Sequence, residues 1–142
     1  MKIRIKKLHP DAMIPAYQTS QAAGFDLHAL DDAVLHVGER KLIGTGLAMA
    51  MDAGYELQIR PRSGLALKHG ISVLNTPGTV DSDYRGEIKV LLINMGEEPF
   101  VIKAGERIAQ GVIKEVIQGV FECVEELDQT ERGTGGFGST GR

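Results

Sequence analysis

The sequence predicts one all-β domain of the sandwich, jelly-roll or barrel type. Short segments in which apolar and polar residues alternate recur along most of its 142 residues, and turn signals separate them. Residues 63–70 instead have the composition of a short helix, and the last residues form a flexible glycine-rich C-terminal arm. Many short strands at this spacing can bury their apolar faces only in packed sheets or a closed barrel.

The elements follow one another along the chain. At the N-terminus, Ile3 and Ile5 alternate with basic residues, as in a strand with one buried face. The helix is expected to begin with Ser63 as its cap and to end at Gly70. Period-two alternation predicts strands at residues 3–6, 34–35, 47–51, 55–60, 88–93, 101–102, 108–116 and 120–124.

Composition and charge narrow the function classes. The formal net charge of -3 offers no polycationic surface, so we expect no direct nucleic-acid binding. Cys123 is the only cysteine, which excludes an internal disulfide and fits a cytoplasmic or nuclear setting. No apolar segment is long enough to span a bilayer, and the N-terminus alternates like a strand rather than a signal peptide. We therefore expect no membrane association.

The most informative segment is residues 78–87, with the sequence GTVDSDYRGE. It places two carboxylates, a phenol and a guanidinium between two glycines that let the backbone bend. A rigid strand leaving such a cluster can hold polar groups in fixed positions, as catalysis requires. Asp81 and Asp83 could also bind a metal directly, although the glycine bends leave open whether both side chains share a face.

Residues 132–141 have the parts of a phosphate-binding loop. The glycines expose N–H groups, Ser139 and Thr140 add hydroxyls, Arg132 adds a fork of donors, and Phe137 can stack on a base. No Gly-Lys-Thr/Ser sequence follows, so this is not a Walker loop. A disordered linker is the alternative on composition alone. We expect the arm to be mobile when empty and ordered by a polyanionic ligand, because ordering ten residues costs on the order of 10–20 kcal/mol.

Three shorter segments carry weaker signals. In residues 61–66, Arg62 and Ser63 stand at a strand-to-helix junction, where a guanidinium, a hydroxyl and helix N–H groups can bind an anion. The alternative is that Ser63 only caps the helix. Residues 23–29 offer the Asp26 carboxylate beside a glycine, and residues 105–110 offer the Gln110 amide. Taken alone, each of these two segments is more typical of a surface turn.

Together the five segments resemble, in order and content, the five motifs of the homotrimeric dUTP pyrophosphatase (dUTPase) family. The central DSDYRGE and the C-terminal GGFGSTG are the closest matches, and the resemblance covers nearly the whole chain. It implies a jelly-roll-like, distorted β-barrel over residues 1–128 and a mobile lid over phosphate and uracil at residues 129–142. It also implies a homotrimer with shared active sites. The matching segments are residues 23–29, 61–66, 75–87, 105–110 and 132–141.

Members of this family hydrolyse dUTP to dUMP and pyrophosphate with Mg²⁺ on the triphosphate, which keeps uracil out of DNA and supplies dUMP for dTTP synthesis. By this resemblance, Asp81 is the general base that orients a water for attack on the α-phosphorus. Asp26 matches a carboxylate that contacts the metal through water, which suits Mg²⁺. Phosphate-binding positions are matched by Arg62, Ser63, Gly64 and Gln110, and the lid over the γ-phosphate by Arg132, Gly138, Ser139 and Thr140.

Residues 75–84 match the family's pyrimidine-binding hairpin. Tyr84 is expected to pack under the deoxyribose, leaving no room for a 2′-hydroxyl, and Phe137 to stack on uracil. Cytosine would leave the polar groups of the hairpin unpaired, a penalty that can reach roughly 10⁴-fold. The acceptor-donor-acceptor edge of uracil would be met by the Asn75 amide and by the backbone of Gly78, Thr79 and Val80.

The other charged residues of the central segment have no such role in the family. We expect Asp83, Arg85 and Glu87 to hold the hairpin in shape. Two alternative functions stay open: a dCTP deaminase-like relative, and an added regulatory binding role on the same scaffold. The match of Asn75 and of the GGFGSTG arm argues for uracil, and the match of Asp81 argues for retained catalysis.

Overall fold

Ten strands and one short helix form the structure, a computed structural model that describes residues 1–141. The all-β prediction is confirmed. The elements are β1 (Arg4–Lys7), β2 (Phe25–His28), β3 (Ala33–Leu35), β4 (Arg40–Ala50), β5 (Tyr55–Arg60), α1 (Ser63–His69), β6 (Ile71–Val73), β7 (Gly78–Asp81), β8 (Glu87–Asn94), β9 (Phe100–Ile102) and β10 (Arg107–Glu115).

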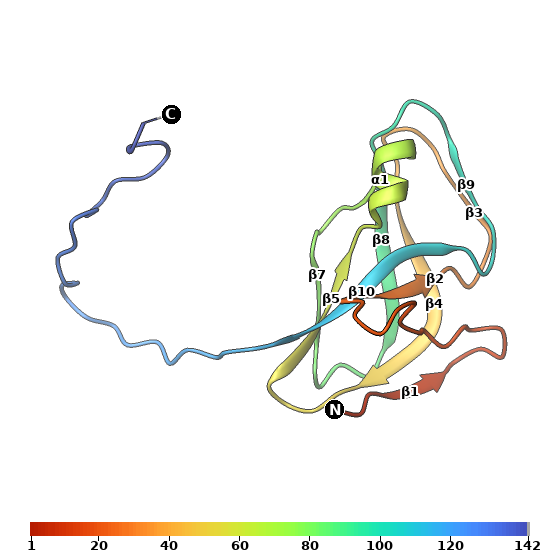
Figure 1. The fold of residues 1–142 in the computed structure, drawn as a ribbon, viewed down its shortest axis with the longest axis horizontal. Helices are drawn as coiled ribbons and strands as arrows, with labels where there is room; N and C mark the ends of the chain where they lie inside the picture. The colour runs from red at the N-terminus through yellow and green to blue at the C-terminus, as the bar shows by residue number, and fades with distance from the viewer. Residues whose placement is uncertain (142) are drawn as a thin grey trace.

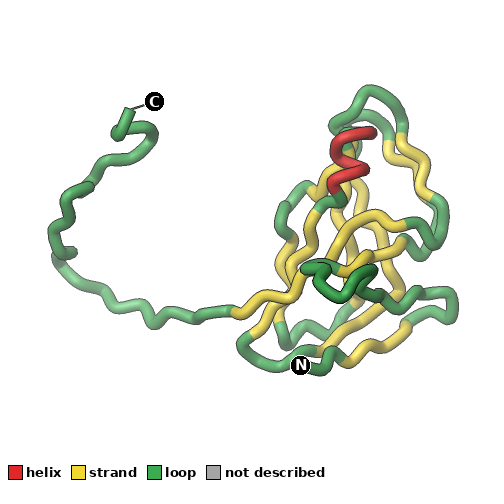
Figure 2. The backbone as a smooth tube through the Cα atoms, in the orientation of Figure 1, coloured by secondary structure: helices red, strands yellow, loops and turns green. Residues whose placement is uncertain are grey.

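The strands pair antiparallel in three sheets (Figure 1). One four-stranded sheet has the order β1-β4-β8-β6, the other has the order β2-β10-β5-β7, and β3 pairs with β9 in a two-stranded sheet. Neighbouring strands are mostly not consecutive in the chain, as in a jelly roll. Helix α1 lies at one end of this body (Figures 1 and 2).

The core lies between the apolar faces of the sheets. Strand β8 shows why: Ile88, Val90 and Leu92 are buried and alternate with more exposed residues. Asn94 continues this buried row, and its amide donates to the carbonyls of Leu35 at 2.9 Å and Glu98 at 2.8 Å. Because these bonds replace lost water contacts, a buried amide is tolerated here.

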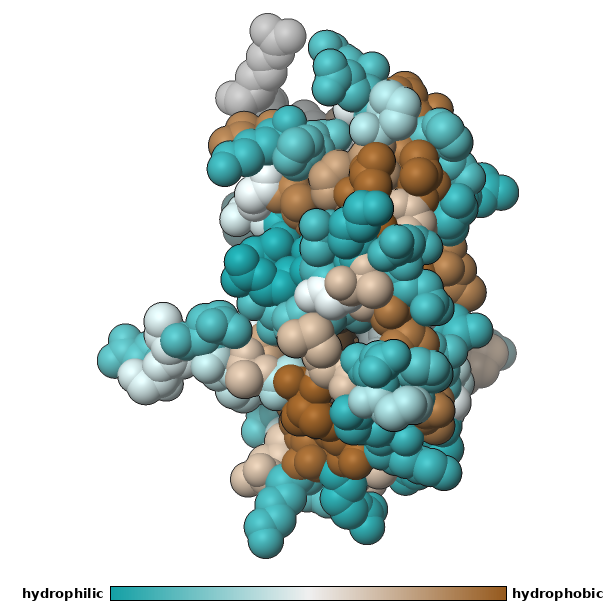
Figure 3. All heavy atoms as spheres, turned by 90° about the vertical axis from the view of Figure 1, so that its right-hand side faces the viewer, coloured by the Kyte–Doolittle hydropathy of each residue, from teal (hydrophilic) through white to brown (hydrophobic). Residues whose placement is uncertain are grey.

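The surface away from the arm is mixed in character. Figure 3 shows apolar side chains there in patches interrupted by hydrophilic ones. Within residues 1–141, no helix is both long and apolar enough to cross a bilayer.

Most sequence-predicted elements are confirmed, with one error of detail at the helix and three omissions among the strands. Gly70 ends the helix with a left-handed φ of 67°. Ser63 is not the cap, because Arg62 occupies that position with extended backbone, and no side chain caps the helix. The three strands that the sequence did not predict are β2, β6 and β7.

The predicted strand at residues 120–124 is wrong. After β10 ends at Glu115, residues 116–141 contain neither helix nor strand and lead away from the body (Figures 1 and 2). Val120 and Phe121 are almost fully exposed, so their alternation has no sheet to pack on. The proposed boundary between residues 128 and 129 stays a prediction.

A chain truncated after Glu131 should keep its fold. The hydrogen bonds of residues 132–141 are made within the arm, for example from Arg132 Nε to the Gly135 carbonyl at 2.8 Å. We expect the free energy of unfolding to change by less than about 0.5 kcal/mol, as for changes away from packed features. Urea denaturation of both proteins measures this, and a clearly destabilised truncated chain would show that the arm is structural.

Candidate functional site

A cleft of about 330 Å³ opens beside β7 and the turn that follows it. The apolar side of the cleft includes Ile59, Val73 and Leu91. A concave site with an apolar floor and a few polar groups suits a planar ligand. The cleft brings together the residues predicted to bind the pyrimidine and the sugar and the predicted general base. They are Asn75, Gly78, Thr79, Val80, Asp81 and Tyr84.

The floor of the cleft depends on the absence of a side chain at Gly78. A Cβ there would lie 3.2 Å from the Cβ of Ile59 on the neighbouring strand and 3.5 Å from Nδ2 of Asn75. Gly78 therefore lets β7 approach β5 closely, which the register Ile59 opposite Gly78 requires. Asn75 is thereby kept next to the backbone of β7.

Local contacts also fix Tyr84. Its hydroxyl donates to the Glu87 carbonyl at 3.1 Å, and the backbone N–H of Tyr84 donates to the Asp81 carbonyl at 3.2 Å. A Cβ at Gly86 would collide with the Tyr84 hydroxyl, so the ring occupies the space that a larger residue would fill. The phenol ring is held at the edge of the cleft.

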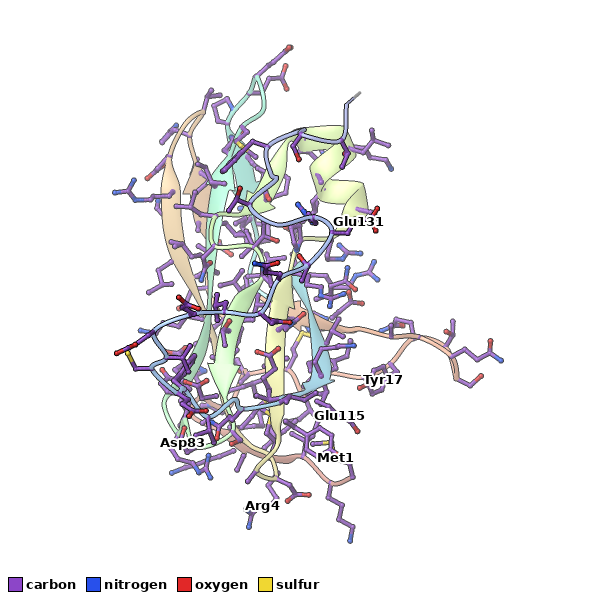
Figure 4. All side chains as sticks on the ribbon, turned by 90° about the vertical axis from the view of Figure 1, so that its left-hand side faces the viewer. Met1, Arg4, Tyr17, Asp83, Glu115 and Glu131 are labelled. Atoms are coloured by element: carbon purple, nitrogen blue, oxygen red, sulfur yellow. The ribbon has the colours of Figure 1, made fainter. Side chains whose placement is uncertain are left out.

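Arg85 and Glu87 make contacts that hold the turn in shape. Arg85 donates to the carbonyls of Ser82 at 2.7 Å and Tyr84 at 3.0 Å. Glu87 accepts from the Gly46 N–H at 3.0 Å, which ties the end of the turn to β4. Asp83 is exposed in the loop, at the end of the body away from α1 (Figure 4).

The predicted phosphate-binding residues gather around the other end of β5. Gln110 on β10 lies opposite Asp26 on one neighbouring strand and opposite Arg60 on the other. Its amide donates to the Pro61 carbonyl at 2.9 Å. A second pocket is lined by both Gln110 and Ser63. A Cβ at Gly24 would collide with the Gln110 amide oxygen, so this glycine, two residues before Asp26, makes room for the Gln110 side chain.

Asp26 forms ion pairs with two arginines. Its Oδ1 lies 3.3 Å from Nε of Arg62, and its Oδ2 lies 3.5 Å from Nη1 of Arg107. The Asp26 side chain is only 13% exposed. Arg107 was missed as a site residue, because the sequence gives no sign that it contacts Asp26.

His28 lies two residues beyond Asp26 on β2. It lines a third pocket, separate from that of Gln110 and Ser63, together with Arg62 and Arg107. Burial lowers the pKa of His28 below its ordinary value of 6.5, and the charges of both arginines lower it further. The Asp26 carboxylate acts in the opposite direction. The Nδ1 atom of His28 is buried without a hydrogen-bond partner in the described part of the chain.

The two groups of residues are separated within one chain. Asp81 lies opposite Glu56 on β5, and Arg62 follows Glu56 by six residues of extended chain. At 3.2–3.4 Å per residue, this spacing amounts to about 20 Å. The arm residues Arg132 and Phe137 belong to neither group, and the arm leads away from the body (Figure 1). One chain therefore does not bring all the predicted site residues together.

No protein cage for a metal is found in residues 1–141, where no three His, Cys, Asp or Glu side chains gather into a possible site. The single carboxylate of Asp26, beside Arg62 and Gln110, suits a metal ion that arrives with a ligand and is held mainly by that ligand. Mg²⁺ retains waters and is often held by one or two carboxylates together with substrate phosphates. The residues present fit such a metal, carried by the ligand and contacted by Asp26 through water.

Comparisons with known proteins match this chain over nearly its full length. The family model described as dUTPase matches residues 11–141. Deoxyuridine 5'-triphosphate nucleotidohydrolases are 68% identical in Nautilia profundicola, over all of both chains, and 65% identical in Wolinella succinogenes, over all of this chain and 95% of the relative. The Staphylococcus bacteriophage 80alpha dUTPase, solved with dUPNHPP, has a TM-score of 0.92 and 27% identity and covers 99% of each chain.

The lowered pKa of His28 has a consequence for stability. In the unfolded chain, histidine takes up its proton near pH 6.5, whereas folded His28 does so only at lower pH. The free energy of unfolding should therefore fall as pH drops below about 6.5, until the folded pKa is passed. Denaturation of wild type and His28→Gln across this range measures the effect, and His9→Gln serves as an exposed control. An equal slope in wild type and His28→Gln would contradict the assignment.

Proposed function

The chain belongs to the dUTPase family and is a dUTP diphosphatase, and from this premise we propose how its residues carry out the reaction. The enzyme hydrolyses dUTP to dUMP and pyrophosphate through attack of an Asp81-activated water on the α-phosphate. The observation that carries this proposal is the cleft beside β7, which collects the pyrimidine residues and has Asp81 in its lining.

The cleft selects the base and the sugar. Uracil is held by the Asn75 amide and by backbone groups of β7, which can supply donors and an acceptor to its O4, N3–H and O2 edge. Cytosine reverses part of that pattern and leaves groups unpaired. Tyr84, fixed by its hydrogen bond to the Glu87 carbonyl, packs under the deoxyribose and rejects a 2′-hydroxyl by contact.

Asp81 acts as the general base. It ends β7 and is exposed, so a water molecule can reach its carboxylate. A carboxylate oxygen accepts the proton of this water as the water oxygen bonds to the α-phosphorus and pyrophosphate leaves. The hydrogen bond from the Tyr84 N–H to the Asp81 carbonyl restrains the backbone that carries this base.

The triphosphate is bound by charge and by hydrogen-bond donors. We assign Arg62, Ser63, Gly64 and Gln110 to the phosphates, because the first two lie at the start of α1 and Gln110 shares a pocket with Ser63. The C-terminal arm closes over the nucleotide. Its contributions are the Arg132 guanidinium, the Phe137 ring on uracil, and the backbone and hydroxyls of Gly138, Ser139 and Thr140.

Mg²⁺ is the proposed cofactor, with Asp26 contacting it through water. When bound to the triphosphate, the ion would neutralise phosphate charge that otherwise opposes the approach of the electron-rich water oxygen. Asp26 is suited to this contact because its carboxylate is already oriented by Arg62 and Arg107. A second protein carboxylate is not required, since Mg²⁺ retains several of its waters.

A homotrimer with shared sites is the proposed assembly. The separation of about 20 Å between Asp81 and Arg62 within one chain supports it, because both must act around one triphosphate. An arm that leads away from its own body can close over a neighbouring copy (Figures 1 and 2). The proposed cellular setting is the cytoplasm or the nucleus, where the reaction limits uracil in DNA and supplies dUMP for dTTP synthesis.

A substrate panel tests the proposed function. Pyrophosphate release is measured from dUTP, dCTP and UTP with Mg²⁺, alongside ammonia release from dCTP. We expect rapid release from dUTP. Release from dCTP should be slower by a factor of roughly 10⁴, because cytosine leaves buried polar groups of the hairpin without partners. Release from UTP should also be slower, because its 2′-hydroxyl meets the Tyr84 ring. Ammonia release from dCTP would instead identify a deaminase.

Asp81→Asn tests the base directly. The amide cannot accept the proton of the water, so turnover should fall by at least about 10²-fold, the lower range for loss of a general base. The dissociation constant of a non-hydrolysable dUTP analogue should change little, because the shape of the cleft is retained. Wild-type turnover in this variant would remove Asp81 from the role.

A further inference from the structure

A β-bulge in β10 sets the position of Arg107. Along the pairing with β2, Arg107 lies opposite His28 and Ala109 lies opposite Leu27, so Ile108 is an extra residue. Arg107 and Gln110 are three residues apart and would point to opposite faces of a regular strand. The bulge brings both to the face that carries Asp26, and bulges re-aim side chains in this way next to functional sites.

Arg107 contacts both of its charged neighbours. Its Nη1 lies 3.5 Å from Oδ2 of Asp26, and its backbone carbonyl accepts from Nη1 of Arg62 at 3.3 Å. The Nε of Arg62 lies 3.3 Å from the other oxygen of Asp26. The three residues therefore form a closed set of contacts in which each one restrains the other two.

Folding stability accounts for only part of this arrangement. The Arg107 side chain is half exposed, which limits what its ion pair contributes to folding. The Asp26 carboxylate, in contrast, is mostly buried and has a second arginine on its other oxygen. Arg107 is thus placed where its main effect is on the orientation of Asp26 and Arg62.

We propose that Arg107 is a positioning residue for the triphosphate end of the site. It holds the Asp26 carboxylate, and with it the Arg62 guanidinium, in the orientation in which they meet the phosphates and the water shell of their metal. This inference rests on the proposed function, because it assigns Arg107 to the same phosphate group of residues.

A double-mutant cycle on ligand affinity tests this role. Calorimetry with Mg²⁺ and an imido analogue of dUTP gives the dissociation constant for wild type, Arg107→Gln, Asp26→Asn and the double variant. We expect Arg107→Gln to raise the dissociation constant roughly 10-fold, as for loss of a charge-assisted hydrogen bond. In the Asp26→Asn background, the same change should cost less than about 2-fold, because Arg107 then has no carboxylate to hold.

Lys103→Gln provides the matched control. Lys103 carries the same charge in the turn before β10 but pairs with Asp32 and does not contact Asp26. Its loss should leave the dissociation constant unchanged, which separates positioning from a general effect of net charge. Thermal unfolding checks that each variant is folded, and Arg107→Lys, which loses the guanidinium fork, repeats the cycle if Arg107→Gln is not folded.

Two results would overturn the inference. One is an unchanged dissociation constant in Arg107→Gln, and the other is an equal loss from Arg107→Gln in both backgrounds, which would mean that Arg107 acts independently of Asp26. Turnover of dUTP by wild type is measured in parallel. If wild type neither binds the analogue nor hydrolyses dUTP, the proposed function fails and the inference fails with it.

Discussion

The register of β5 between its two neighbours determines where the chemistry of this protein lies. At one end of β5, Glu56 is paired with Asp81 on β7, and at the other end Arg60 is paired with Gln110 on β10. A slip of one residue would send either partner to the opposite face of the sheet. Gly78 permits the close approach of β7, and burial of Leu57 and Ile59 anchors β5 in the core.

The same register divides the site into two groups. The cleft proposed for the pyrimidine, with Asp81 in its lining, lies at one end, and Asp26 with its two arginines lies near α1 at the other. Each group is held by its own short contacts, such as the Tyr84 hydroxyl on the Glu87 carbonyl. The groups are about 20 Å apart along the strand direction, and this separation supports the proposal that a complete site draws on more than one copy of the chain.

The sequence predicts the parts that depend on local pattern. Alternation predicts β5, β8 and β10, and Gly70 predicts the end of the helix, because these signals reflect burial and backbone freedom at single positions. Residues 120–124 show the limit of that signal. They alternate as a strand does, but a strand forms only where a partner strand exists, and none lies beside them among the described residues. The Arg107 contacts depend on a bulge and on cross-strand pairing, which one-dimensional pattern does not contain.

Mixing two inactive variants tests the division of the site most directly. Asp81→Asn lacks the proposed general base and Arg62→Gln lacks a guanidinium proposed to bind phosphate, and each should be inactive alone. If the two residues act from different copies, an equal mixture that is unfolded and refolded together should recover about a quarter of wild-type turnover, the share of sites in random closed oligomers that receive both intact residues. A mixture no more active than the separate variants would contradict the account.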